Sequence, residues 1–228
     1  MHAPRVIVVA AIALQAFAAS AQANIGENAA KTVQIVQSRA ANATLLKQYT
    51  WNERIDFLVN GQEKDLRLDL VNIGLDGKLQ RTIMNDQSAP LPRGFIRRAI
   101  AEGKKKDLQQ YIQGLGELLH KYTLPTPGAV LNFLDTATTV PSGPGQLMVT
   151  GQNVVQPGDS LTIYLDAATK KTQRVTVSTT FQGNPVSLTA TFATLASGLN
   201  YPAYAEVVVP AKGYDVKVQN FNYQQNGM

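Results

Sequence analysis

The clearest hydrophobic pattern in the chain is a run of three strands between Ser160 and Leu195. Along each strand apolar and polar residues alternate, as in Leu161-Thr162-Ile163-Tyr164-Leu165. A period of two with one apolar face predicts a sheet that is exposed to solvent on one side and covered on the other. Gly183-Asn184-Pro185 predicts the turn between the second and third strands. The function therefore depends on what covers the apolar face.

The N-terminal half of the chain predicts a helix followed by three strands. Small and apolar residues recur every three or four positions from Ile25 to Lys47, which is typical of an amphipathic helix. From Tyr49 to Asn60 the period changes to two. Asn60-Gly61 and Asp76-Gly77 have the composition of hairpin turns. These features predict a three-stranded meander.

A helical insertion separates this meander from the later strands. The helical period returns after Pro92, and Gly103 beside a run of lysines predicts a break or kink. Val130 to Ala137 fits a strand or a helix. The remaining predicted strands are Gln146 to Val155 and a closing hairpin of Val207 to Val209 with Tyr214 to Gln219.

Together these elements predict an α+β fold in one domain. We expect a curved antiparallel sheet of about nine strands, an incomplete β-barrel with helices in its concave face. The alternative is a small α+β unit that ends near residue 140, followed by a β-sandwich.

The N-terminus has the pattern of a signal peptide. Val6 to Ala19 is an apolar run without a charge, and Ala21-Gln22-Ala23 is a small-x-small cleavage site. We expect a signal peptide at 1–23, cleavage after Ala23 and a single mature domain at 24–228. The chain has no cysteine, which excludes disulfides, thiolate metal sites and a lipid-anchored N-terminus. A periplasmic or secreted bacterial protein fits these features.

The net charge of +5 at pH 7 is mild. Much of the excess lies in a basic patch formed by Arg93, Arg97, Arg98, Lys104, Lys105 and Lys106. Such a patch suits an anionic membrane surface, and the other interpretation is a solvated helix face. The patch is not interleaved with aromatic residues, so we do not expect nucleic-acid binding.

Residues for catalysis are scarce. His120 is the one histidine after the predicted signal peptide, and it falls at the end of a predicted helix, where the helix dipole favours a cation. A Ser-His-Asp arrangement would depend on this residue alone. Spaced metal ligands and nucleotide-binding glycine motifs are not found. We expect no enzyme activity, no metal and no cofactor.

Two charged residues occur on apolar faces of predicted strands. Glu53 shares a face with Trp51 and Ile55, and Arg81 lies between Leu79 and Ile83. A buried charge is costly unless it is paired, so we expect Glu53 and Arg81 to approach each other. The alternative is a β-bulge that shifts the phase and exposes Glu53.

The apolar faces themselves have two interpretations. If the amphipathic helices cover these faces, their residues are part of the core. If the helices are hinged, the same residues line a cavity for an acyl chain or an apolar peptide. The residues concerned are Trp51, Phe57, Leu68, Leu70, Leu161, Ile163, Leu188 and Phe192.

The order of elements resembles that of a known family. Ser160-Leu-Thr-Ile-Tyr-Leu-Asp166, Thr169-Lys170-Lys171 and Arg174-Val-Thr-Val177 resemble a strand-turn-strand of the periplasmic lipoprotein carriers, the LolA and LolB family. Tyr49-Thr-Trp51-Asn-Glu-Arg54 is similar to the opening strand of secreted bacterial proteins of unassigned function. The resemblance implies a half-barrel that shelters acyl chains under helices.

Two functions remain open at this point. The first is a non-catalytic periplasmic protein that shelters a lipid or a lipoprotein acyl chain in a half-barrel cavity. The second is an envelope structural or interaction protein whose core is filled by its own helices and which holds no ligand. Neither interpretation identifies a protein partner.

Overall fold

The computed structural model of the protein describes residues 41–74, 76–88, 95–123 and 127–226. The predicted signal peptide and most of the predicted first helix lie outside them, and residues 41–46 form the described end of that helix. The elements that follow are β1 (Tyr49–Val59), β2 (Gln62–Ile73), β3 (Leu79–Ser88), α2 (Phe95–Thr123), α3 (Pro127–Thr136), β4 (Thr138–Pro141), β5 (Gln146–Gln152), β6 (Ser160–Asp166), β7 (Thr172–Phe181), β8 (Asn184–Thr194), β9 (Asn200–Val209), η1 (Pro210–Lys212) and β10 (Tyr214–Gln225).

All described strands belong to one antiparallel sheet. Their spatial order is β3-β2-β1-β10-β9-β8-β7-β6-β5-β4, so the first strand pairs with the last. This pairing joins the N-terminal meander and the later strands, and it excludes the alternative of a separate β-sandwich. The sheet has ten strands rather than about nine, because the ambiguous segment before Thr138 forms α3 and a short strand, β4, follows it.

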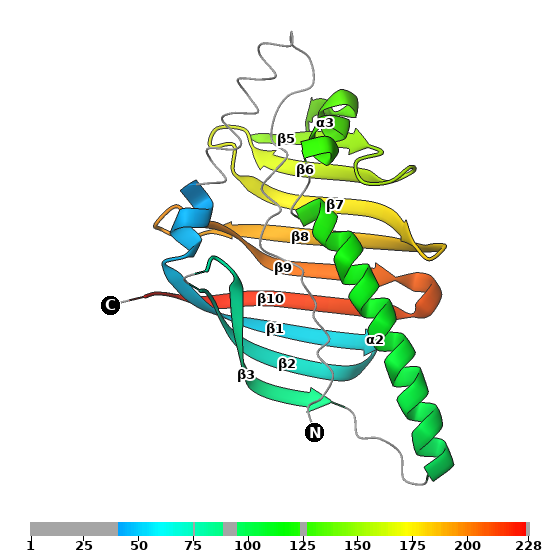
Figure 1. Cartoon of the computed structure of the whole chain (residues 1–228). Helices are drawn as coiled ribbons and strands as arrows, with labels where there is room; N and C mark the ends of the chain where they lie inside the picture. The colour runs from blue at the N-terminus through cyan, green and yellow to red at the C-terminus, as the bar shows by residue number, and fades with distance from the viewer. Residues whose placement is uncertain (1–40, 75, 89–94, 124–126, 227–228) are drawn as a thin grey trace.

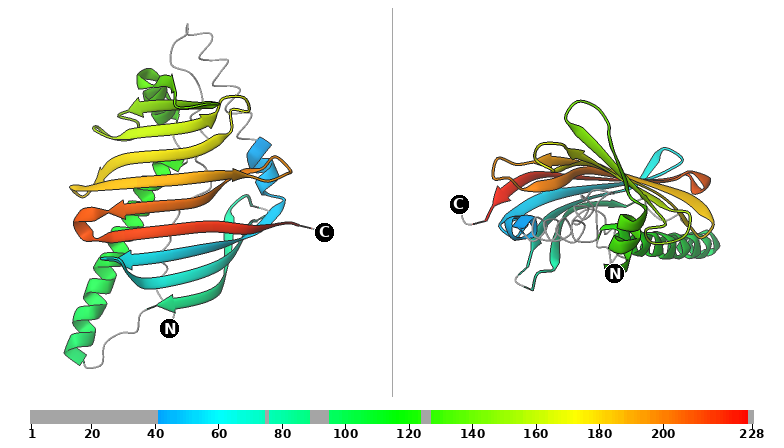
Figure 2. Two further views of the ribbon diagram at one scale, coloured as in Figure 1. Left: turned by 180° about the vertical axis from the view of Figure 1, so that it is seen from behind. Right: turned by 90° about the horizontal axis from the view of Figure 1, so that it is seen from above.

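The sheet is curved and open, as expected for an incomplete barrel. Figure 1 shows the strands stacked from β3 at one edge to β4 at the other, with α2 lying obliquely across them. Seen from above, the sheet arches over α2 and α3, which lie on its concave side (Figure 2). The fold is therefore α+β, with helices in the concave face.

The helical connection runs from one edge of the sheet to the other. It leaves β3 and returns at β4, and these strands are the two edges. A helix of 29 residues such as α2 is about 43 Å long, which is close to the width of ten strands spaced about 4.8 Å apart. The predicted break at Gly103 is wrong, since α2 is continuous through it. One glycine costs a helix only about 1 kcal/mol, which the rest of a long helix offsets.

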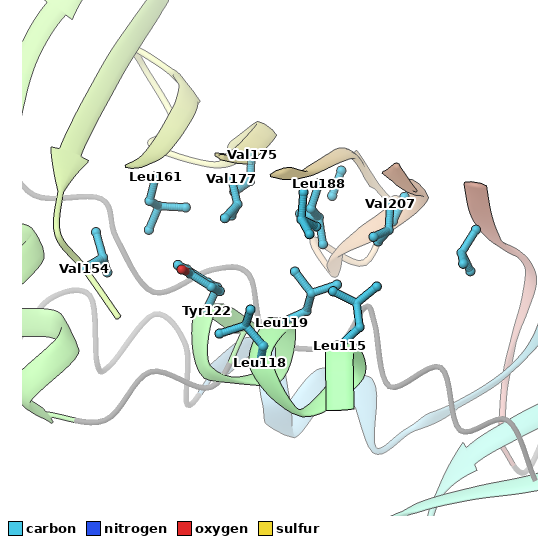
Figure 3. Close-up of a cluster of buried hydrophobic side chains, with 14 of the residues drawn as sticks. Leu115, Leu118, Leu119, Tyr122, Val154, Leu161, Val175, Val177, Leu188 and Val207 are labelled. Atoms are coloured by element: carbon cyan, nitrogen blue, oxygen red, sulfur yellow. The ribbon is translucent and has the colours of Figure 1, made fainter. Parts of the chain in front are cut away.

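The C-terminal half of α2 packs against the concave face. Figure 3 shows Leu115, Leu119 and Tyr122 projecting from α2 towards the apolar side chains of the strands. Gly114 lies so close to the Phe181 ring that a Cβ atom there would come within 2.8 Å of it. The helix therefore rests directly on β7 at this point.

A buried hydrogen-bond network fastens the end of α2 to the sheet. The Tyr122 hydroxyl donates to Oδ2 of Asp159 at 2.6 Å and lies 2.9 Å from the hydroxyl oxygen of Thr179. The Asp159 carboxylate also accepts backbone N–H bonds from Val154, Val155 and Gln156. Because all these groups satisfy one another away from water, the network holds α2 in one position over β7.

Replacing Tyr122 with Phe removes one hydrogen bond to a buried carboxylate without changing the shape of the ring. We expect the free energy of unfolding to fall by about 1.5–3 kcal/mol, the range for a bond to a charged group. Urea denaturation followed by circular dichroism measures it. The control is Tyr164→Phe on the opposite face, where Arg174 packs over the ring and not on the hydroxyl. Equal stability of both variants would contradict the proposed anchoring of α2.

Candidate functional site

A β-bulge in the first hairpin decides which residues of β2 face the concave side. Val59 pairs with Gln62, but Phe57 pairs with Asp65, so Lys64 is one extra residue in β2. Because side chains alternate along a strand, this single residue reverses the faces of the rest of β2.

Leu68 and Leu70, which we expected on the face of Trp51 and Phe57, lie on the convex face. They pair with Arg54 and Asn52, whose side chains point away from the helices. Without the bulge, the same leucines would stand opposite Glu53 and Trp51. Leu70 is exposed and Leu68 is half-buried. The expectation that these two residues line a cavity is therefore wrong.

The bulge places two charged residues beside Glu53 instead. Glu53 pairs with Asp69 and Ile55 pairs with Arg67, so Asp69 and Arg67 are on the concave face. Arg81 reaches the same place from β3, where it pairs with Val71. We call Glu53, Asp69, Arg67 and Arg81 the charged cluster.

Both acids of the charged cluster are ion-paired. Nε of Arg81 donates to Oε1 of Glu53 at 2.8 Å, and Nη2 lies 3.4 Å from Oε2. Nε of Arg67 donates to Oδ1 of Asp69 at 2.7 Å. The predicted approach of Glu53 and Arg81 is confirmed, and the alternative that a bulge exposes Glu53 is wrong. In β1, one register shift lies between Thr50 and Asn52 and the other between Phe57 and Leu58. Glu53 lies between these two bulges and stays buried.

Burial differs between the acids and the bases of the charged cluster. Glu53 is 1% exposed and Asp69 is 0% exposed, whereas the side chains of Arg81 and Arg67 are 17% and 19% exposed. The arginine side chains are therefore the more exposed members of the charged cluster. Burial raises the pKa of the Glu53 carboxyl above its usual range; the neighbouring Arg81 opposes this rise, and Asp69 adds to it.

Apolar clusters lie on both sides of the charged cluster along β1. On one side, the Trp51 ring stacks on Tyr223 with 5.4 Å between ring centroids, and its indole N–H donates to Asn220. On the other side, Ile55 and Phe57 belong to the core beneath α2. The two groups form separate apolar clusters of buried residues, and Glu53 stands between them in the strand. The concave face of β1–β3 thus combines charge with apolar surface.

The other residues predicted to line a cavity are part of the packed core. Leu161, Ile163 and Leu188 are completely buried in the cluster that includes α2 side chains, and Phe192 packs against it half-buried. Trp51 and Phe57 are also buried on the concave side. Over β6–β8 the helices therefore fill the concave face with their own side chains.

The basic patch falls mostly on residues that the structure does not describe. Arg93 lies outside the described residues, as do the side chains of Arg97, Arg98, Lys104 and Lys105, while Lys106 is exposed. His120 lies in the last turn of α2, where we expected it.

Among the described residues, no three His, Cys, Asp or Glu side chains are placed to ligate a metal ion. In the same part of the chain, none of the helices has the length and apolar character needed to cross a membrane.

Sequence reasoning missed Arg67 and Asp69 as members of the site. Their alternation with three leucines predicts the opposite orientation, because leucines usually occupy the covered face. The bulge at Lys64 has no distinctive residue type, so the local sequence does not indicate it.

The charged cluster predicts a specific dependence of stability on pH. Since the pKa of Glu53 is raised in the folded state, the folded protein holds this proton more tightly than the unfolded chain does. Its contribution to stability is full below the ordinary pKa of a glutamate and is lost as pH rises through the raised value. We therefore expect the stability of wild type relative to Glu53→Gln to fall as pH rises from about 4.5.

Denaturation of both proteins at several pH values measures this difference. Both proteins contain the other carboxyl groups, so the contributions of those groups to the difference cancel. Asp166→Asn is the control with the opposite sign. Hydrogen bonds from Thr169 and Ala168 lower the pKa of Asp166, so the stability of wild type relative to this variant rises with pH. A Glu53 difference that rises with pH in the same way would contradict the raised pKa.

Comparisons with protein-family models and with curated protein sequences found no match. Three solved structures are similar over most of the chain. A DUF1329 family protein from Desulfovibrio piger has 11% identity and a TM-score of 0.35, with 85% of this chain and 94% of that chain covered. A putative outer membrane lipoprotein-sorting protein domain from Vibrio parahaemolyticus has 8% identity and a TM-score of 0.39, with 86% and 92% covered.

A LolA superfamily protein from Nitrosomonas europaea has 10% identity and a TM-score of 0.36, with 84% of this chain and 94% of that chain covered. Two of these three proteins are thus described as a lipoprotein-sorting protein domain and a LolA superfamily protein, the family that the strand-turn-strand at Ser160–Val177 resembles.

Proposed function

We propose that this chain is a non-catalytic protein of the bacterial envelope that shelters a hydrophobic ligand, a lipid or a lipoprotein acyl chain, on the concave side of its half-barrel. The proposal rests on the exposure of one apolar residue on the concave face of β3. Ile83 pairs with Asp69 and so shares the concave face with Glu53, yet its side chain is 53% exposed. A large apolar side chain exposed inside a curved sheet is suited to contact with an apolar ligand.

The position of Ile83 in the sheet supports the same proposal. The side chains of α2 from Tyr111 to Tyr122 fill the core over β6–β10. Ile83 lies on the edge strand at the other end of the sheet and belongs to neither of the described core clusters. A ligand there would complete the apolar cover that the helix supplies elsewhere.

The proposed location rests on the N-terminal pattern. Residues 1–23 have the pattern of a signal peptide that is cleaved after Ala23, and 24–228 would be the mature single domain. A ligand with acyl chains is abundant in the bacterial envelope, so the location and the ligand agree. Lys106 and its basic neighbours in the sequence would face an anionic membrane surface.

The absence of catalysis is also part of the proposal. The two buried acids of the concave face are ion-paired with arginines at 2.7–2.8 Å, so neither stands ready as a general base. His120 lies at the end of α2, on a different element from the charged cluster.

A second candidate function is that of an envelope interaction protein with a self-filled core. The close packing of Leu161, Ile163 and Leu188 against α2 favours it. Leu70 on the convex face and Met84 on the edge strand are exposed apolar residues available for a protein partner. The two candidates differ in whether an apolar ligand binds.

Binding of an apolar probe tests the proposal. We expect the purified protein to take up a fluorescent fatty acid, and Ile83→Asp to bind it about tenfold more weakly because a charge then replaces apolar contact surface. The matched control is Thr82→Asp, since Thr82 is the exposed neighbour of Ile83 on the opposite face of the same strand.

Organic extraction of the purified wild type, followed by mass spectrometry, identifies the lipid that copurifies. If no lipid copurifies and the probe does not bind, the protein is not a carrier and the interaction candidate stands. Equal binding by Ile83→Asp and Thr82→Asp would place the ligand elsewhere than on the concave face of β3.

A further inference from the structure

We propose that the charged cluster recognises the anionic head of an amphiphile, a carboxylate, sulfonate or phosphate attached to an apolar chain, through the guanidinium groups of Arg67 and Arg81. This inference rests on the proposed function, because it names the class of the sheltered ligand. It goes beyond that function because it assigns the binding of the ligand's polar head to Arg67 and Arg81.

The exposure of the two arginines supports this assignment. The side chains of Glu53 and Asp69 are almost completely buried, whereas those of Arg81 and Arg67 are 17% and 19% exposed. A group that approaches the charged cluster from solvent therefore reaches the arginine side chains before the buried acids. The planar fork of an arginine matches carboxylate and phosphate oxygens in a bidentate manner. Glu53 accepts from two nitrogens of Arg81, and a guanidinium has five N–H donors in all.

Stability alone does not explain these four residues. A buried ion pair is often no better for stability than apolar residues of similar size, because removing the charges from water costs about as much as their attraction returns. At the equivalent depth, β1 carries Trp51 and Ile55, so an apolar face is readily built there. The two buried acids and their arginine partners lie between two apolar clusters. A polar ligand group bound by the arginines explains their presence better.

The surroundings fit a molecule with a polar head and an apolar tail. Ile83 lies next to Arg81 on the concave face of β3, two residues along the strand, and is exposed. Val71 pairs directly with Arg81. A head group on the two arginines can therefore continue into a chain that covers Ile83, without crossing a polar region.

The charge balance of the cluster adds a dependence on pH. The groups that face Glu53 are Arg81 from β3, Asp69 and Arg67 from β2, and Tyr223 from β10. A bound anion adds negative charge near Glu53 and favours its protonated form, so anion binding is expected to strengthen as pH falls. Since burial already raises the pKa of Glu53, this proton uptake begins at a higher pH than it would for an exposed glutamate.

Three ligands with matched parts test the proposal: octanesulfonate, octanol and methanesulfonate. The sulfonate head is always ionised, so the ligand itself does not titrate. Fluorescence of Trp51, the only tryptophan, reports binding, because Trp51 is two residues from Glu53 in β1. We expect wild type to bind octanesulfonate roughly tenfold more tightly than octanol, and methanesulfonate much more weakly than both.

The variants separate recognition from structural support. Arg81→Gln and Arg67→Gln should each lose most of the preference for octanesulfonate and keep their affinity for octanol. Glu53→Gln should increase the preference and remove its dependence on pH, which a merely structural role would not do. The double variant Glu53→Gln with Arg81→Gln avoids an unpaired buried charge and should also lose the preference. Arg174→Gln on the convex face is the control that should leave it unchanged.

Each other outcome overturns the proposal in a distinct way. Equal binding of octanesulfonate and octanol by wild type and Arg81→Gln would leave the proposed carrier function intact and exclude head-group recognition. Methanesulfonate binding as tightly as octanesulfonate would mean a site for small free anions and not for an amphiphile. Binding of none of the three ligands would overturn the proposed function together with this inference.

Discussion

The antiparallel pairing of β1 with β10 is the contact on which the rest of the structure depends. It joins the first described strand to the last, so the meander of β1–β3 extends the sheet of β4–β10. The two edges are then β3 and β4, which are consecutive in the chain except for the helices between them. The connection has to cross the width of the sheet, and a long helix over the concave face is the element that spans this distance (Figures 1 and 2).

The described side chains of α2 cover one part of the concave face, so the face has two parts. Over β6–β10, the C-terminal half of α2 interdigitates with the strands, and the network around Tyr122 and Asp159 fixes its position (Figure 3). Ile55 and Phe57 of β1 still belong to this core, but next to them the concave face of β1–β3 carries the charged cluster and the exposed Ile83. The first part accounts for stability, and the second part offers surface for a ligand. The two candidate functions correspond to these two parts.

The charged cluster itself follows from one extra residue. The bulge at Lys64 turns Arg67 and Asp69 towards Glu53 and turns Leu68 and Leu70 away from it. Each buried carboxylate thereby gains an arginine partner, and each arginine side chain stays partly exposed. In the regular register, and with the pairing of β2 and β3 unchanged, Glu53 would pair with Leu68, and Arg67, Asp69 and Arg81 would lie on the opposite face. The two arginines that satisfy the buried acids are thus also the more exposed residues of the charged cluster, which lies between two apolar clusters.

The sequence by itself determined the α+β class, the extent of most strands, the helical insertion and the approach of Glu53 to Arg81, because alternation, turn residues and the cost of an unpaired buried charge are local properties of the chain. It did not determine the partner of β1, the continuity of α2 through Gly103 or the orientation of β2. Strand order depends on contacts between residues far apart in the sequence. The face of β2 depends on a register shift of one residue, which reverses every side chain beyond Lys64 and has no signature in residue type. Tertiary structure alone therefore decided that Arg67 and Asp69 join Glu53 and Arg81 on the concave face.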